Sequence, residues 1–365
     1  IPHAFFTLSY KLDFLGVTFK STFMATRKAN GDILKERIKN VIGPWKGGLF
    51  MPLNMRSHSV NTYAISKLMY RCNVIDPRVE DIAYFNSMSK SFIFCGLLEK
   101  HEEITLYRET QDGGLGFVNI QSRAKAALTF SFLQTAINPN FQRNNYHQTL
   151  YLHYVQNKPI PAPKIPPNFA GDFFPTIHKL KAVKTNIDLS TIKSVYDFLI
   201  ADTLRVEDQE ADPTQRSLIP LRCERSHPDT DWKRSWRLAR LKGLGPDLSS
   251  FILKMLWGIL PSMDRLHHIK PKEYTNPSCP LCSIPGHPRP ETLAHALTEC
   301  EANKDLPALL LNQLQVHVPG LSFRQVLTLD LELEPSLELP LTWLIGSSLL
   351  SLWKQREEGK INLTK

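Results

Sequence analysis

The chain has 365 residues, of which 42% are hydrophobic and 22% are charged, and it carries a formal net charge of +9. This composition excludes a wholly disordered protein and allows two or three domains with buried cores. Six cysteines are too few for a disulfide scaffold in a chain of this length. No signal peptide opens the chain, and the longest uncharged apolar stretch, residues 339–353, is short for a membrane helix of roughly 20 residues. We therefore expect no membrane partner, whereas the positive charge favours an anionic one.

The N-terminal part reads as mainly helical, with a few short strands. Alternating Leu15, Val17 and Phe19 predict a strand near the start of the chain. Apolar residues at helical spacing predict an amphipathic helix over 79–92. A basic helical pattern predicts a helix over 33–41, and further helices are expected over 58–71 and 124–137. Between the helices at 79–92 and 124–137, residues 104–117 predict an extended piece closed by a glycine turn, so we expect strands again near 104–120.

The C-terminal part begins after a proline-rich stretch, which has five prolines within residues 158–167 and predicts a stiff linker. Further helices are predicted over 190–202, 232–241, 249–260, 305–316 and 341–356, and a polar loop over 207–231. The expected domains are 1–157, a helical region at 171–260 and a metal-binding region at 261–365, with a linker at 158–170. The predicted fold class is thus mainly α, a helical bundle with a small metal knuckle.

The strongest chemical motif is Cys279-Pro280-Leu281-Cys282, followed by His295 and Cys300. Two cysteines separated by two residues on a tight turn place both sulfurs on one side, and a following helical turn can supply a histidine and a cysteine. Thiolates and imidazole suit Zn²⁺, and four protein ligands leave no open position. The spacing therefore predicts one structural zinc ion.

His287 is an alternative third ligand, because it also follows Cys282 closely. We favour His295, whose spacing to Cys300 lets both residues face one ion. The alternative to a metal site is a set of free thiols beside an incidental histidine. The other three cysteines, Cys72, Cys95 and Cys223, have no comparable partners in the sequence and are expected to be core or surface thiols.

The second motif is a basic, aromatic helix over residues 232–242, which holds five cations in eleven residues. Its cations could neutralise phosphates, and Trp232 and Trp236, one helical turn apart, could stack on bases. The alternative is a solvated basic face with the two tryptophans in the core, which we favour for the tryptophans. Residues 1–60 also hold nine Lys or Arg against three Asp or Glu. The expected nucleic-acid contacts are Arg27, Lys28, Lys35, Arg37, Lys39, Lys233, Arg234, Arg237, Arg240 and Lys242.

Several catalytic motifs are missing from the sequence. It contains no phosphate-binding G-x4-G-K-[ST] loop, no G-x-S-x-G and no H-E-x-x-H. Nor does it contain an Asp-Asp pair, and two-metal polymerase chemistry needs clustered carboxylates to hold Mg²⁺. We therefore predict no catalytic residues, no small-molecule substrate and no enzyme activity of this chain alone.

Taken in order, the motifs resemble the region that follows the palm in reverse transcriptases of non-LTR, LINE-type retrotransposons. Phe14-Leu15-Gly16-Val17 resembles the strand after the palm, and Asp112-Gly113-Gly114-Leu115-Gly116 resembles a Gly-Gly-Leu-Gly turn of that family. Further similar segments are Trp45, Ala124 with Ala126 and Ala127, Ser194–Leu199, Asp231–Trp236, Leu256–Pro261, Glu291-Thr292 within the cysteine–histidine segment, and Trp353-Lys354-Gln355-Arg356.

The resemblance implies a thumb, linker and zinc-binding region that grips template RNA and target DNA during target-primed reverse transcription. It also implies RNA or DNA as partner and the nucleus as location. The Asp-Asp palm would precede Ile1, and the sequence starts without a methionine, so we expect a fragment of a longer polymerase. The alternative is a zinc-stabilised protein-interaction module whose charge is incidental. The sequence does not indicate an oligomeric state.

Overall fold

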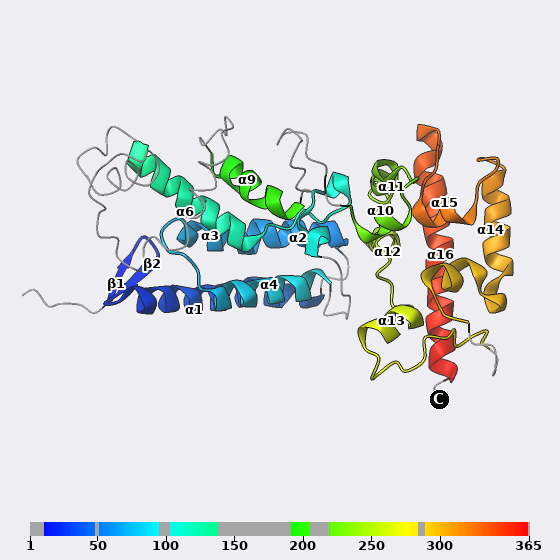
Figure 1. Cartoon of the computed structure of the whole chain (residues 1–365), viewed down its shortest axis with the longest axis horizontal. Coiled ribbons are helices and arrows are strands. Elements are labelled where there is room, and N and C mark those ends of the chain that lie inside the picture. The colour runs from blue at the N-terminus through cyan, green and yellow to red at the C-terminus, as the bar shows by residue number, and fades with distance from the viewer. Residues whose placement is uncertain are drawn as a thin grey trace, which may run out of the picture. The chain divides into compact units, whose positions relative to one another are not determined.

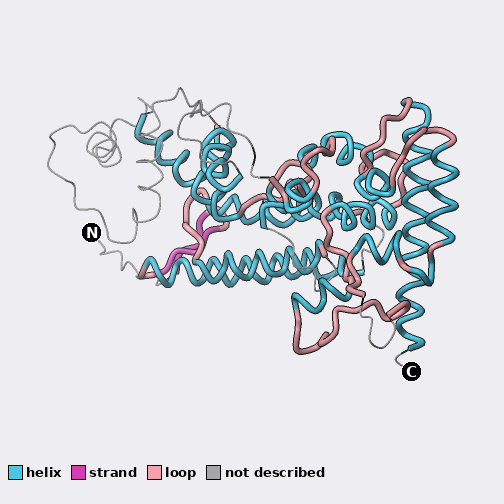
Figure 2. Tube along the Cα trace, turned by 45° about the vertical axis from the view of Figure 1, so that its right-hand side comes forward, coloured by secondary structure: helices cyan, strands magenta, loops and turns pink. Residues whose placement is uncertain are grey.

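The computed structural model describes residues 11–47, 51–94, 103–137, 191–204, 218, 220–283 and 289–363 (Figures 1 and 2). Helices dominate these residues, so the prediction of a mainly α chain is confirmed. No helix among them is long and apolar enough to cross a membrane. The described residues fall into two compact units. Unit 1 comprises the described parts of 1–46, 58–92 and 118–218, and unit 2 those of 47–57, 93–117 and 219–365.

These units differ from the predicted domains, because segments far apart in sequence pack within the same unit. Residues 93–117 belong with 219–365, although the sequence analysis assigned them to an N-terminal domain. The predicted boundary at residue 260 lies inside unit 2. The proline-rich stretch at 158–170 lies outside the described residues, as do Cys95 and His287.

Unit 1 opens with a hairpin in place of the single predicted strand. Strand β1 (Lys11–Phe14) pairs antiparallel with β2 (Val17–Lys20), with Phe14 opposite Val17. The turn between them needs left-handed backbone at Leu15 (φ 47°) and Gly16 (φ 78°), the combination that closes a two-residue hairpin. Alternation of apolar residues correctly indicated extended backbone at Val17 and Phe19, but Leu15 lies in the turn, which the alternation did not indicate.

The helices of unit 1 pack around one another and against this hairpin (Figure 1). Their bounds are α1 (Phe23–Ile42), α3 (Ser66–Cys72), α4 (Val79–Ile93), α6 (Ile120–Ile137) and α9 (Ile192–Leu204). A π-helical turn at Val60–Ile65 precedes α3 in unit 1, whereas most of α2 (Leu53–Ser59) belongs to unit 2. Helix α6 packs against α9 and α3, and α1 packs against the hairpin and the π-helical turn.

Helix α1 begins ten residues earlier than predicted because its first turns bury a polar face. The side chain of Thr22 caps the helix by accepting a hydrogen bond from the Ala25 amide at 3.2 Å. The buried Asn30 amide then binds β2: Oδ1 accepts from Thr18 N at 3.0 Å, and Nδ2 donates to Thr18 O at 2.7 Å. Apolar periodicity cannot indicate a face that packs through hydrogen bonds.

Unit 2 is built around the long helix α16 (Pro335–Leu363), which contacts α11, α12, α14 and the turn at His295–Glu299 (Figure 1). The other helices are α10 (Arg222–Ser226), α11 (Trp232–Leu238), α12 (Pro246–Leu256), α13 (Met263–Ile269), α14 (Asp305–Gln315) and α15 (Phe323–Thr328). Helices α10, α13 and α15 were not predicted, since five to seven residues are too few to show a helical period.

The predicted strands near 104–120 are wrong. This segment forms α5 (Glu103–Tyr107), a 3-10 turn at Thr110–Asp112 and an irregular stretch. The irregular stretch satisfies its amides on carbonyls of the preceding residues: Leu115 N donates to Thr105 O at 2.9 Å, and Phe117 N to Leu106 O at 2.7 Å. The backbone therefore needs no partner strand. The predicted glycine turn is present, with left-handed Gly113 (φ 83°).

Candidate metal centre

Four side chains of unit 2 converge on one point. The Sγ atoms of Cys279, Cys282 and Cys300 and a ring nitrogen of His295 all lie within 4.8 Å of one another. Cys279, Cys300 and His295 are buried, and Cys282 is half-buried. These are the four ligands predicted from the spacing, and together they could hold one metal ion.

Two separations between the ligand atoms are close to those of a tetrahedral site. Bonds of about 2.3 Å to sulfur at the tetrahedral angle place two sulfurs roughly 3.8 Å apart, and a sulfur and a nitrogen roughly 3.5 Å apart. Cys279 Sγ and Cys300 Sγ lie 3.9 Å apart, and Cys282 Sγ lies 3.2 Å from His295 Nε2. The donor atoms thus surround a space of the right size for a single small cation.

A short backbone ladder builds the cysteine knuckle. Cys279 N donates to Arg289 O at 2.8 Å, and Glu291 N donates to Pro277 O at 2.9 Å. Ser283 N closes the turn by donating to Cys279 O at 3.2 Å. These bonds bring the strand-like residues before and after the turn together, so that Cys279 and Cys282 face the segment that carries His295.

His295 opens a π-helical turn, His295–Glu299, that leads directly to Cys300. Thr292 Oγ1 accepts a hydrogen bond from His295 N at 3.1 Å, which fixes the start of the turn. Cys300 leaves the turn in extended conformation. The wider π-helical turn lets a histidine and a cysteine five residues apart contribute to one cluster, as π-helical segments often do at functional sites.

Burial raises the pKa of the Cys279, Cys282 and Cys300 thiols. Without a cation these groups therefore stay protonated at neutral pH. A bound divalent ion reverses that preference, because its charge stabilises coordinated thiolates far more than burial opposes them. Metal binding at this cluster thus releases protons and weakens as the pH falls.

A buried ion pair fastens the knuckle to α16. The Glu291 carboxylate, 0% exposed, accepts hydrogen bonds from Arg356, which is 1% exposed; Nε lies 2.7 Å from Oε1, and Nη2 contacts Oε2. Oε2 also accepts from Met263 N at 2.7 Å, at the start of α13. The Arg356 guanidinium lies over the Trp353 ring, 4.3 Å from its centroid. These residues stand out in the sequence only through the resemblance, because pairing between residues 65 apart leaves no local pattern.

The arginines of the predicted basic helix α11 form ion pairs with other residues of unit 2. Arg237 forms a bidentate ion pair with Glu338 of α16, with both contacts at 2.6 Å. Arg234 lies 3.2 Å from carboxylate oxygens of both Asp330 and Glu332. The sequence did not indicate these partners, which follow α15 or belong to α16.

Arg240 also makes its contacts within unit 2, and its guanidinium is largely buried. Its guanidinium donates to Trp236 O at 3.0 Å and to Gly114 O at 2.9 Å, and burial lowers its pKa to about 10, so it stays charged at neutral pH. Of the predicted contacts in this segment, Arg240 is thus turned inward, whereas Arg237 is exposed although paired with Glu338. Lys233 and Lys242 are exposed, and no ion pair of either is found among the described residues.

The two tryptophans of α11 stack on each other, with ring centroids 5.1 Å apart. Trp236 is 1% exposed, in agreement with the core interpretation, whereas Trp232 is only half-buried. Trp236 packs against the glycine turn: a Cβ on Gly113 would lie 2.4 Å from its ring. Trp257 Nε1 donates to Gly113 O at 2.8 Å, so the turn and two helices form one packed unit.

In α1, the predicted contacts divide into paired and exposed residues. Arg27 donates to Asp76 Oδ2 at 2.9 Å and to the carbonyls of Asp76 and Pro77. Lys35 Nζ lies 2.7 Å from the buried Asp81 carboxylate. The remaining three, Lys28, Arg37 and Lys39, are exposed.

Neither the protein-family models nor the curated proteins with which the sequence was compared contain a match to this chain. The resemblance to non-LTR reverse transcriptases therefore stands on the motifs themselves.

Proposed function

We propose that this chain is a zinc-stabilised nucleic-acid-binding module, corresponding to the thumb, linker and zinc-binding region of a non-LTR retrotransposon reverse transcriptase. In this role it grips template RNA and target DNA and does not polymerise on its own. The observation that carries the proposal is the cluster of Cys279, Cys282, His295 and Cys300, whose ligand atoms could hold one ion.

Zinc is the metal that this ligand set suits best. Three thiolates and one imidazole at tetrahedral separations are typical of structural zinc sites. Four protein ligands leave no position for a substrate or a water, so the ion stabilises the fold and takes no part in a reaction. His295→Ala should lose the ion, whereas His287→Ala should keep it, and metal analysis of the purified variants distinguishes the two candidate histidines.

The contacts between motif residues give the proposal further support. Gly113 and Trp236 pack together, and Glu291 pairs with Arg356 beside Trp353. Segments that carry the resemblance, although distant in sequence, are therefore in contact within unit 2. Such contacts are expected if the order of the motifs reflects one folded region rather than a chance alignment of short patterns.

Binding to RNA and DNA across a salt series tests the nucleic-acid role. Phosphate contacts release counterions, so the logarithm of the affinity should fall linearly with the logarithm of salt concentration. We expect such a slope for the zinc-loaded chain with single-stranded RNA and with duplex DNA. Affinity that is absent at low salt, or independent of salt, would favour the protein-interaction alternative.

Primer extension tests the claim that the chain is not itself a polymerase. An RNA template, a DNA primer, Mg²⁺ and nucleoside triphosphates should give no product with this chain alone, because the sequence holds no Asp-Asp pair of the kind that binds the two metal ions. Magnesium-dependent extension above background would contradict the proposal.

A further inference from the structure

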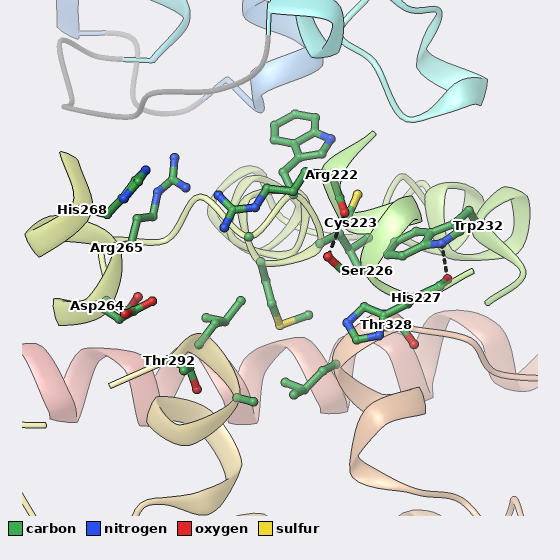
Figure 3. A pocket seen from close by; sticks show the side chains of 18 residues that line it. Arg222, Cys223, Ser226, His227, Trp232, Asp264, Arg265, His268, Thr292 and Thr328 are labelled. Atoms are coloured by element: carbon green, nitrogen blue, oxygen red, sulfur yellow. Dashed lines mark hydrogen bonds between the residues drawn. The ribbon is translucent and has the colours of Figure 1, made fainter. Parts of the chain in front are cut away.

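A pocket of about 380 Å³ lies beside the candidate metal centre, entirely within unit 2 (Figure 3). Its walls come from α10, α11, the end of α12, α13 and residues 292–294, which immediately precede the metal ligand His295. Neither the motifs nor the ion pairs described above account for it. Its volume is in the lower part of the range for small-ligand sites, roughly 300–1,000 Å³, which fits one nucleotide and is too small for a duplex.

The rim of the pocket carries more positive than negative charge. Figure 3 shows Arg222 reaching toward the middle of the opening, with Arg265 and His268 on one side of it. Asp264 is the one acid among the described residues that line the pocket. Burial lowers the pKa of His227, on the opposite side, so that imidazole is neutral at pH 7 and can accept or donate a hydrogen bond. The balance of charge favours an anionic ligand.

The interior combines apolar and polar residues. Met255 and Leu256 are buried and line the pocket, as do Ser226, Thr292 and Thr328. An apolar surface with a few polar groups is typical of a site that orients a heterocycle.

Trp232 gives the pocket a rigid aromatic wall. It is half-buried, stacks on Trp236, and donates from Nε1 to His227 O at 3.0 Å. A side chain held on one ring face and through its ring nitrogen loses little freedom when a ligand packs against it.

We propose that this pocket binds one nucleotide of a single-stranded nucleic acid, with the phosphate at Arg222 and Arg265 and the base between Trp232 and the apolar floor. The inference rests on the proposed function and deepens it, because it assigns single-strand recognition to a defined site. It also links recognition to the metal: residues 292–294 form one wall, and Thr292 accepts the hydrogen bond from the ligand His295.

The first test measures binding of uridine monophosphate and of a short single-stranded RNA to the zinc-loaded chain. Arg222→Gln with Arg265→Gln should weaken both affinities by at least about tenfold, since each lost contact is a charge-assisted hydrogen bond. The matched control, Lys272→Gln with Lys304→Gln, also removes two exposed cations of unit 2, and neither residue lines the pocket. It should leave uridine monophosphate binding unchanged. Zinc content and melting temperature verify that each variant is folded.

Inorganic phosphate serves as a competitor that lacks the base. It should displace uridine monophosphate only at much higher concentration, and equal competition would overturn the assignment of the base to the interior of the pocket. A second measurement needs no variant: RNA containing 4-thiouridine should crosslink on irradiation to peptides that include residues 222–232 or 264–268.

The two proposals fail in different ways. If the RNA binds with a salt-dependent affinity but crosslinks elsewhere and is unaffected by the Arg222 and Arg265 changes, the pocket assignment is wrong and the nucleic-acid role stands. If no RNA binds at low salt, both are wrong.

Discussion

In unit 1, helix α1 leaves Lys28, Arg37 and Lys39 exposed, whereas in unit 2 the arginines of α11 and the following Arg240 bind other parts of the same unit. The two helices look alike as basic segments in the sequence. They differ because α11 faces carboxylates near and within α16 and the carbonyls of the glycine turn. A count of cations therefore does not measure the charge available to a partner.

The two units also differ in what holds them together. Unit 2 combines the metal cluster with a buried Glu291–Arg356 pair and arginines turned inward. Unit 1 relies on helix packing and on polar contacts such as Asn30 with Thr18 and Lys35 with Asp81. This comparison predicts that unit 2 depends on its metal and that unit 1 does not.

Removal of the proposed zinc ion should have the largest effect. In small zinc domains the binding free energy, roughly 10–16 kcal/mol, is also folding free energy. Cys279→Ser or a strong chelator should therefore increase hydrogen exchange throughout 275–302 and leave α1, α4 and α6 protected. Cys223→Ala, which removes a thiol of the same unit outside the cluster, should keep one equivalent of zinc. Equal loss of protection in both units would contradict the comparison.

The second largest effect is expected from breaking the buried Glu291–Arg356 ion pair. Arg356→Met leaves the fully buried Glu291 carboxylate without its main partner and should reduce the free energy of unfolding of unit 2 by about 3–5 kcal/mol. The double variant Glu291→Gln, Arg356→Met should recover part of this loss, because the unpaired charge is gone. Arg237→Met breaks an ion pair whose arginine is 54% exposed and should cost at most about 1 kcal/mol. Denaturant titrations of the four proteins give these values.

The glycine turn of unit 2 should tolerate substitution poorly at one position and better at another. Gly113→Ala requires a left-handed alanine and places its Cβ 2.4 Å from the Trp236 ring, so we expect a loss of about 2–4 kcal/mol. Gly116 is also left-handed, but an added Cβ would have no neighbour closer than 3.8 Å. Gly116→Ala should therefore show the backbone cost alone, about 1–2 kcal/mol. Equal losses would show that the contact with Trp236 is unimportant.

In unit 1, Asp81 predicts a pH dependence. Burial opposes ionisation of this carboxyl, but hydrogen bonds from Arg78 and Lys35 outweigh burial and lower its pKa. Its contribution to stability is therefore complete above the unfolded-state pKa of about 3.9 and is lost as the pH falls through the lower folded-state value. Asp81→Asn should cost about 1–3 kcal/mol at pH 7 and reduce the acid sensitivity of α1 and α4. Hydrogen exchange between pH 7 and pH 3 measures both effects.

The sequence predicted best what is local. Apolar periodicity located α4, α6, α9, α12 and α14 closely, and cysteine spacing identified the four residues of the metal cluster. Prediction from the sequence failed where a contact joins distant segments: the polar face of α1, the partners of α11 and the Glu291–Arg356 pair. The strands expected near 104–120 failed for the same reason, because the amides of 115–117 bind carbonyls of the preceding helix, and neither periodicity nor composition indicates that pairing.

The salt dependence of nucleic-acid binding gives the smallest effect and the most direct test of the contrast between α1 and α11. Lys28→Gln, Arg37→Gln and Lys39→Gln together remove three exposed cations, and if each meets a phosphate of duplex DNA, the slope of log affinity against log salt should become shallower by roughly 2–3. Arg237→Gln with Glu338→Gln deletes an ion pair without changing net charge. It should leave the slope unchanged, because that arginine is already neutralised by its partner. A shallower slope in the pair deletion, with the fold intact, would show that α11 gives up its internal contacts to bind phosphate. An unchanged slope in the α1 variant would show that its exposed cations are merely solvated.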